Sequence, residues 1–538
     1  MSLLERQECE SDATPGLDLA KKTLEDIYIK YSGDPQIFAK MHNYVCFRLP
    51  GVIDEMKRAS DERRVRNEYL STEQDTFITS FLNDNQYFYC PQTELFFYYN
   101  GLHYLKKRED DVLHHVLTSI TKDCNTLIPR KPQTKVYIMK RVKESNPLKS
   151  IPESATIQDV LDSLYPTLFS TKSAAKYFLT ILGDHLLKKI DDSTHAYFTT
   201  PKAKEFLREV ASVSQSLFGQ SAVSQFKYKY HSHPFRTVRL VQMNDSVGVE
   251  SVWRPILQMK SIDLLCVAAH YSGRYESADQ YLESYSDDAD LAKYATHFRW
   301  KTASEVVGEF ATEYLRVSDS RDLTIESNTM EYLWKKYLKD RRFPAILGSN
   351  AFSAAIVERF PDKYDAATNT FRGISSSHAC IVDRFRQFWG ESIIVDKSDN
   401  LAEYEIDELV MMYRCKFADE NNRITDSQML DLIRFYEDVE IVDSKFVQGV
   451  KSVMWDKQEE LRVFFAEIMK INEARKLTES DSITFYDAYS SYQRYCKNGR
   501  SLADKKRKTI GGQMISKNYF EKYAYESFEN VADNKFWF

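Results

Sequence analysis

The chain is poor in the two residues that interrupt regular secondary structure and rich in aromatic residues. It has 16 glycines and 14 prolines in 538 residues, each roughly half of average usage or less, but 34 tyrosines and 32 phenylalanines. Turn-dense β-sandwiches need many turn residues, whereas helices packed around aromatic side chains do not. We therefore expect a predominantly helical α+β protein with small antiparallel sheets.

The length predicts several domains, because one domain takes ~100 to 200 residues. Shifts in composition and hydrophobic periodicity divide the chain into six segments. These are a flexible arm (1–16), a helical lead-in (17–74), an α+β module (75–218), a mostly helical middle region (219–395), a winged-helix-like domain (396–476) and a C-terminal helix-loop-helix with a basic loop (477–538).

Strand-prone aromatic runs mark the α+β module. The run YFYCPQTELFFYYNGLHYL (87–105) is divided by Pro91, and Asn100-Gly101 is typical of a turn between antiparallel strands. This pattern predicts a small antiparallel sheet. The run KVYIMKRVK, from Lys135 to Lys143, is predicted as another strand.

The segment 396–476 has the element order of a winged helix. Residues 406–417 and 425–436 predict two helices, and Thr425 and Gln428 have the spacing of a capping box at the start of the second. Two strand-like runs follow between residues 439 and 455. Two further amphipathic helices lie in the C-terminal segment, so we expect one or two winged-helix-like units.

The sequence names no reaction. It contains no G-x-x-x-x-G-K-[ST] or G-x-G-x-x-G phosphate-binding loop, no H-E-x-x-H and no G-x-S-x-G. We predict no catalytic residue, no cofactor and no metal, and an ATP-driven motor is disfavoured.

Two groups of histidines leave a metal or acid–base site open as an alternative. Acid-to-histidine pairs occur four residues apart, and two histidines flank a single residue. The residues are Asp110, Asp111, His114 and His115, and His231 and His233. Acids in a first helical turn stabilise the helix dipole without any ligand, and we favour that interpretation.

The distribution of cysteines and of apolar residues predicts an intracellular protein that does not enter the membrane. The eight cysteines are scattered without a C-x-x-C pair. The N-terminal residues carry acids where a signal peptide needs an apolar stretch, and no run of ~18 apolar residues occurs.

Positive charge is concentrated locally although the net charge is -6. Residues 131–143 hold five cations and no acid, 227–239 hold four and no acid, and 497–522 hold eight against two acids. Cations interleaved with aromatic rings suit phosphates and bases. The predicted nucleic-acid-binding residues are Lys135, Lys140, Arg141, Lys143, Lys227, Lys229, Arg236, Arg239, Lys505, Lys506, Arg507, Lys508 and Lys517. A lysine-protected edge strand, a solvated loop and a nuclear-import signal remain alternatives.

Part of the chain resembles viral primase-helicases of the poxvirus type. YFYCPQTELFFYYNGLHY (87–104) with EDDVLHHVL (109–117) resembles the segment ahead of their motor, and the region 483–523 is similar to their winged-helix tails. Residues 156–189 and 439–457 are similar to uncharacterised proteins of nucleocytoplasmic large DNA viruses. The motor's Walker A lysine has no counterpart here, so the resemblance implies a giant-virus protein without a motor.

These observations predict a non-enzymatic nucleic-acid-binding accessory factor of viral replication or transcription. DNA or RNA and viral replication or transcription proteins are the expected partners, in the host cytoplasm, at virus factories, in the nucleus or in the virion. The alternative is a structural or scaffolding protein of a virion or virus factory, for which aromatic surfaces serve as protein interfaces. A metal-dependent nuclease built from scattered carboxylates is a third hypothesis.

Overall fold

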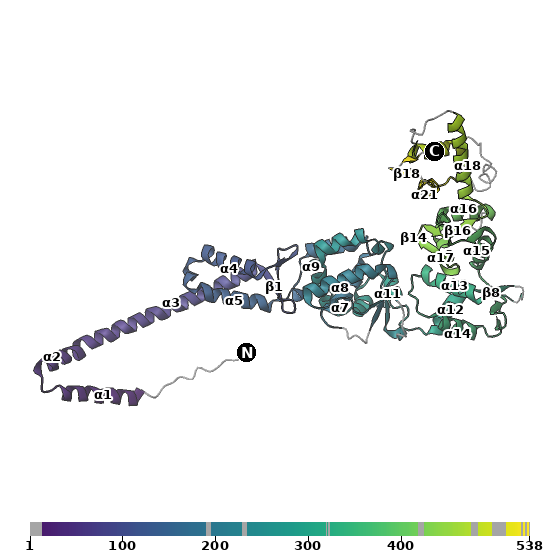
Figure 1. The fold of residues 1–538 in the computed structure, drawn as a ribbon. Coiled ribbons are helices and arrows are strands. Elements are labelled where there is room, and N and C mark those ends of the chain that lie inside the picture. The colour runs from purple at the N-terminus through teal and green to yellow at the C-terminus, as the bar shows by residue number, and fades with distance from the viewer. Residues whose placement is uncertain are drawn as a thin grey trace. The chain divides into compact units, whose positions relative to one another are not determined.

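A computed structural model gives the architecture (Figure 1). It describes residues 13–189, 195–228, 234–318, 320, 323–417, 424–474, 483–497, 513–528, 531–532 and 535–536. The protein is predominantly helical with small, mostly antiparallel sheets, which confirms the predicted fold class. Contacts divide it into two compact units. Unit 1 comprises 1–192, 202–224 and 243–292, and unit 2 comprises 193–201, 225–242 and 293–538.

Unit 1 begins with helices that have almost no core of their own. They are α1 (Ala13–Lys30), α2 (Pro35–Asn43), a short π-helix (Tyr44–Arg48) and α3 (Leu49–Asp84). Asp34 caps α2 by accepting hydrogen bonds from the amides of Gln36 and Ile37. Among the described side chains before β1, only Gln74 and Phe81, both near the end of α3, are buried.

A three-stranded antiparallel sheet follows, as predicted. Its strands are β1 (Gln86–Cys90), β2 (Leu95–Tyr99) and β3 (Tyr104–Lys107), in that order. Gly101 has a φ of 91° in the turn between β2 and β3, a conformation that glycine adopts at little cost. Helices α4 (Glu109–Asp123) and α5 (Lys131–Glu144) pack with this sheet around Phe81, Val116 and Ile138.

The predicted strand from Lys135 to Lys143 is wrong, because these residues belong to helix α5. Thr134, Ile138, Met139 and Val142 are buried, and their spacing of three and four residues places them on one side of a helix. Packing of this side against α4 and β1 outweighs the strand propensity of the β-branched and aromatic residues.

The rest of unit 1 is a helical core built around two closely packed helices. Its main helices are α6 (Ser154–Leu164), α7 (Lys172–Leu186), α8 (Lys204–Phe218) and α9 (Glu250–Tyr275). A Cβ added at Gly183 in α7 would lie 2.0 Å from the carbonyl oxygen of Ala268 in α9. Only glycine permits so close a backbone approach.

Unit 2 contains three consecutive segments with the same order of elements. The first segment (303–375) has α12 (Ala303–Tyr314), β7 (Arg316–Val317), β8 (Thr324–Glu326), α13 (Ser327–Asp340), α14 (Ser349–Arg359), β9 (Tyr364–Asp365), β10 (Thr370–Arg372) and β11 (Ile374–Ser375). The second segment (379–452) has α15 (Ala379–Ser392), β12 (Ile393–Val395), β13 (Glu403–Glu405), α16 (Ile406–Lys416), α17 (Asp426–Tyr436), β14 (Glu440–Val442), β15 (Phe446–Gln448) and β16 (Val450–Ser452). The third segment (457–536) has α18 (Lys457–Ala474), β17 (Ile483–Thr484), α19 (Phe485–Lys497), α21 (Lys517–Ser527), β18 (Val531–Ala532) and β19 (Lys535–Phe536).

The three segments also share their strand pairing. Their sheets have the orders β8-β10-β9, β13-β15-β14 and β17-β19-β18, so in each the strand before the second helix pairs with the last strand of a hairpin. An additional pair, β7 with β11 and β12 with β16, closes the first two segments. The first strands of the three sheets begin at residues 324, 403 and 483.

One sheet of unit 2 differs from the others because it is parallel. It consists of β4 (Ala196–Phe198) between β5 (Phe226–Lys227) and β6 (Val238–Leu240). Its side chains Ala196, Phe198, Val238 and Leu240 belong to the same hydrophobic core as the three segments.

A buried ion pair joins the second and third segments. Lys457 at the start of α18 donates to Glu408 of α16 at 2.9 Å, and both side chains are only 2% exposed. The ammonium group also lies 3.9 Å from the ring centroid of Tyr519 in α21. Burial raises the pKa of Glu408 and lowers the pKa of Lys457, because both charged forms lose hydration.

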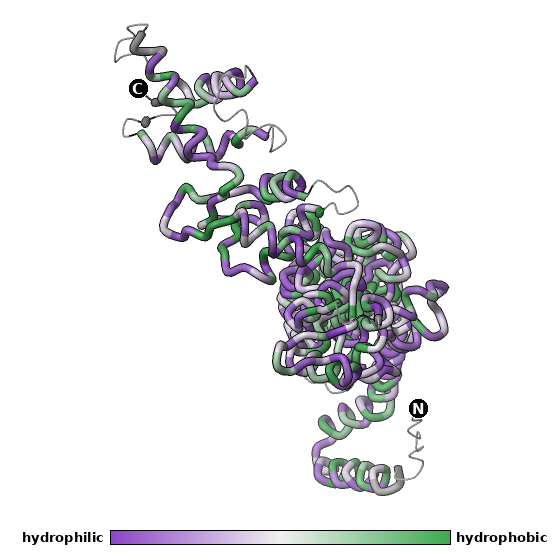
Figure 2. Tube along the Cα trace, turned by 90° about the vertical axis from the view of Figure 1, so that its right-hand side faces the viewer, coloured by the Kyte–Doolittle hydropathy of each residue, from purple (hydrophilic) through white to green (hydrophobic). Residues whose placement is uncertain are grey.

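Figure 2 shows hydrophobic and hydrophilic residues alternating along the N-terminal helices. No helix in the described ranges combines the length and the hydrophobicity that a bilayer-spanning segment requires.

Candidate nucleic-acid interface

Helix α5 presents two of the predicted cations of residues 135–143 freely to solvent. Lys140 and Arg141 are exposed, as are Val136 and Tyr137 between the buried positions. Within the part of the chain that the structure describes, Lys140 and Arg141 form no ion pair. Tyr137 precedes them by three and four residues, so its ring and both cations share one helical face.

The other two predicted cations of α5 are less free. Lys143 pairs with Glu109 at 3.1 Å and lies 5.6 Å from the ring centroids of Tyr89 and Phe96. Lys135 is half-buried. Among the four predicted cations of the helix, the exposed and unpaired ones are therefore Lys140 and Arg141.

The predicted cations of residues 227–239 do not form one exposed surface. Lys227 lies half-buried in β5, and Arg236 is exposed in a short turn before β6. Arg239 in β6 is 2% exposed, and its guanidinium donates to the carbonyls of Arg236 and Val238. Arg239 therefore supports the parallel sheet from inside, and Lys229 lies outside the described residues.

The C-terminal cations are only partly described. Lys505, Lys506, Arg507 and Lys508 lie outside the described residues. Lys517 opens α21 and pairs with Glu521 at 3.4 Å.

The third helix of each segment of unit 2 offers little free positive charge. In helix-turn-helix DNA-binding domains, the helix that follows the turn enters the major groove of DNA and contacts the bases. The only basic residue of α14 is Arg359, and the only one of α17 is Arg434. In α21, Lys522 pairs with Glu403 of the second segment at 3.0 Å.

Two of these third helices also pack on the preceding segment. Phe435 of α17 contacts Tyr332 of α13 with ring centroids 5.4 Å apart. The hydroxyl of Tyr519 in α21 donates to the carbonyl of Leu401 at 2.8 Å. These contacts stabilise the junctions between segments and occupy part of each helix.

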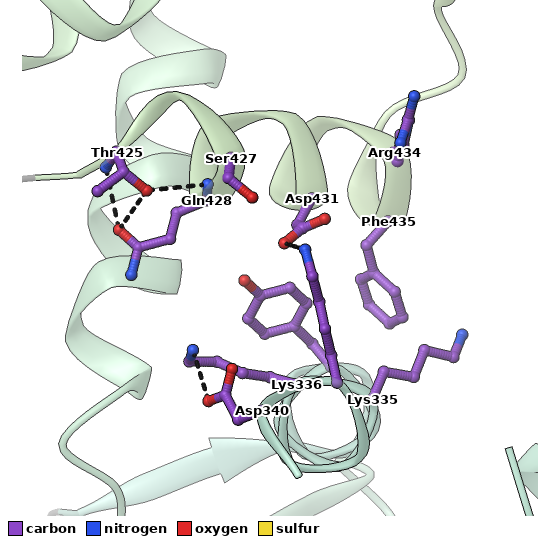
Figure 3. Close-up of a pocket in the computed structure, with 11 residues that line it drawn as sticks. Lys335, Lys336, Asp340, Thr425, Ser427, Gln428, Asp431, Arg434 and Phe435 are labelled. Atoms are coloured by element: carbon purple, nitrogen blue, oxygen red, sulfur yellow. Dashed lines mark hydrogen bonds and ion pairs between the residues drawn. The ribbon is translucent and has the colours of Figure 1, made fainter. Parts of the chain in front are cut away.

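A hollow of about 470 Å³ lies at the junction of α13 and α17 (Figure 3). Its lining includes Lys335, Lys336 and Lys339 of the basic run 334–342 together with Arg434, and each of these four cations has a partner. The pairs are Lys335 with Glu331, Lys336 with Asp340, Lys339 with Asp431, and Arg434 with the hydroxyl of Ser444. Acids neutralise the three lysines, which indicates a segment junction and not a phosphate site.

Sequence reasoning missed a second hollow, of about 920 Å³, which is lined by residues between 293 and 301 and by residues of the first segment. It lies beside Trp300, whose side chain is 79% exposed, and between α12 and the last residues of α13 and α14. The run FRWK (298–301), with a tryptophan between two cations just before a helix, was the available signal.

The described residues do not place the candidate histidines in a metal-binding arrangement. Across the described part of the chain, no group of three or more His, Cys, Asp or Glu side chains is placed to hold a metal ion. His115 instead hydrogen-bonds the hydroxyl of Tyr87 at 2.8 Å. His231 and His233 lie outside the described residues.

Comparisons with family models, with curated proteins and with solved structures found no match to this chain.

Proposed function

We propose that the protein is a non-enzymatic nucleic-acid-binding factor that contacts phosphates through the solvent side of α5. The observation that carries this proposal is the exposed group of Tyr137, Lys140 and Arg141, in which two cations without ion-pair partners in the described chain share a helical face with a ring. Glu144 is the only acid of the helix. Such a surface suits a phosphate backbone better than a protein partner of mixed charge.

The proposed setting is viral replication or transcription, in keeping with the sequence resemblance. We further propose that the three segments of unit 2 are winged-helix units. Their shared order of one helix, a strand, two helices and a hairpin supports this, together with the pairing of the first strand with the last. Because their third helices carry little free positive charge, we propose that these units have a structural role and do not read DNA through those helices.

The test compares two double variants of the full chain in filter-binding titrations. Lys140→Gln with Arg141→Gln removes two phosphate contacts, so the slope of log affinity against log salt should fall in magnitude by about 1.4 for single strands or 1.8 for duplexes. Lys57→Gln with Arg58→Gln is the matched control, because these residues form the same exposed pair on helix α3. Equal slopes for both variants and the wild type would contradict the assignment to α5.

A scaffolding role is the second candidate, and the N-terminal helices favour it. Leu17, Leu24 and Ile27 of α1 and Phe38 of α2 are exposed. Exposed apolar residues along helices without a core of their own are typical of a protein-binding surface. Sedimentation equilibrium tests this role: a mass that rises with concentration, in a protein that binds no nucleic acid, would replace the first proposal with this one.

A further inference from the structure

Trp300 is the most exposed large aromatic side chain among the described residues. It lies in the turn before α12, and the guanidinium of Arg299 is 4.8 Å from its ring centroid. An exposed indole offers a large flat contact area, and tryptophan is enriched among the residues that contribute most to binding.

The hollow beside Trp300 brings together cations from separate elements. They are Lys293, Lys301, Arg341 and Arg359. Gly308 in α12 leaves room for one of them, since a Cβ at this position would lie 3.2 Å from the guanidinium of Arg359.

The acids of the hollow are already engaged. Glu309 pairs with Lys301 at 2.5 Å, and Glu313 pairs with Arg341. Glu305 accepts from the amide of Thr302 at 2.7 Å in the capping box of α12.

Two cations of the hollow remain available for a ligand. Lys293 and Arg359 are exposed and form no ion pair with any described residue. The hollow therefore combines an open aromatic face with free positive charge.

We propose that this hollow binds single-stranded nucleic acid, with a base stacked on Trp300 and neighbouring phosphates held by Lys293 and Arg359. The inference rests on the proposed nucleic-acid-binding function and adds to it a second site and a strand preference. In a duplex the bases stack on one another, so an indole can stack only on a base that is unpaired. A protein partner fits the hollow less well than a nucleic acid. It would bring no phosphates to the free cations, and an apolar side chain inserted into the hollow would find few apolar contacts in the charged lining.

The experiment measures binding of the full chain to a labelled oligothymidylate of about 16 nucleotides and to a duplex of equal length. Trp300→Ala should weaken single-strand binding by roughly fivefold to a hundredfold and leave duplex binding unchanged. Trp300→Phe should recover most of the affinity, because phenylalanine retains a stacking face. Tyr486→Ala is the matched control, since Tyr486 is a comparably exposed aromatic residue on α19.

A second variant tests the phosphate contacts. Lys293→Gln with Arg359→Gln should lower the single-strand salt slope by about 1.4.

The outcomes separate this inference from the function on which it rests. If Trp300→Ala binds the single strand like the wild type while the α5 variant binds more weakly, the hollow is not a nucleic-acid site and Trp300 is left as a protein-contact residue. If the wild type binds neither probe, the proposed function itself is wrong.

Discussion

Replacing Lys457 with methionine tests whether the second and third segments of unit 2 form one cooperative structure. The ammonium group is 2.9 Å from Glu408, and both side chains are 2% exposed. Methionine fills a similar volume but leaves the carboxylate of Glu408 in the core, where the amide of Glu405, at 2.8 Å, is its one remaining donor among the described residues. An uncompensated buried charge of this kind costs about 3 to 5 kcal/mol.

The assay is urea unfolding of the full chain followed by tryptophan fluorescence. Trp455 is a suitable reporter because its ring centroid is 5.9 Å from the Lys457 ammonium group. With a slope of about 2 to 3 kcal/mol per M, the predicted loss moves the transition of this region down by about 1 to 2 M urea. Adding Glu408→Gln should recover at least half of the loss, because the uncompensated charge is then removed.

The matched control is Lys397→Met. Lys397 pairs with Asp438 at 2.9 Å in the second segment, but its own side chain is 61% exposed and that of Asp438 is fully exposed. Water replaces that partner at little cost, so the midpoint should barely move. If Lys457→Met shifted the midpoint no more than Lys397→Met, the buried pair would not hold the segments together.

Two further predictions concern the core of unit 1. Gly183→Ala should lower the free energy of unfolding in urea by about 1 to 3 kcal/mol or more, because its Cβ would meet the carbonyl of Ala268 at 2.0 Å. Gly273→Ala in α9 has open space around the new Cβ and should be neutral or stabilising. Equal effects of the two substitutions would contradict the tight contact between α7 and α9. Burial raises the pKa of Asp184 to about 6 from a usual 3.8, against the opposing hydrogen bond from Ser272, so the folded state keeps a proton that the unfolded chain has lost. Stability relative to Asp184→Asn should therefore fall by up to about 3 kcal/mol as the pH rises from 4 to 6 and then level off, and a constant difference between the two proteins across this range would contradict the shift.

The sequence predicted the elements whose signals are local. Asn100 and Gly101 marked the turn before β3, and Thr425 and Gln428 form the expected capping box of α17. Both depend on residues a few positions apart, so no knowledge of the tertiary packing was needed.

Tertiary packing decided what the sequence could not predict. The run from Lys135 to Lys143 has strand propensity, yet its buried side contacts α4 and the sheet only as a helix. The burial of Arg239 depends on a parallel sheet formed by residues far apart in the chain. The threefold recurrence in unit 2 was not predicted from the sequence and is visible in the order and pairing of its elements.

The candidate site was predicted in part. Lys140 and Arg141 were selected from charge density alone, but their shared face with Tyr137 follows from the helix. Trp300 was missed because its neighbours Arg341 and Arg359 reach the hollow from other helices.

The most direct test of the central claim is the salt dependence of nucleic-acid binding by the unmodified full chain. Affinity for labelled single strands should fall linearly on a plot of log affinity against log salt, and about 0.7 of the slope is expected for each phosphate contact. Lys140 with Arg141 and Lys293 with Arg359 each contribute two phosphate contacts at their own site, so the slope should be about -1.4 or steeper. A slope near zero, or no binding at low salt, would contradict the account.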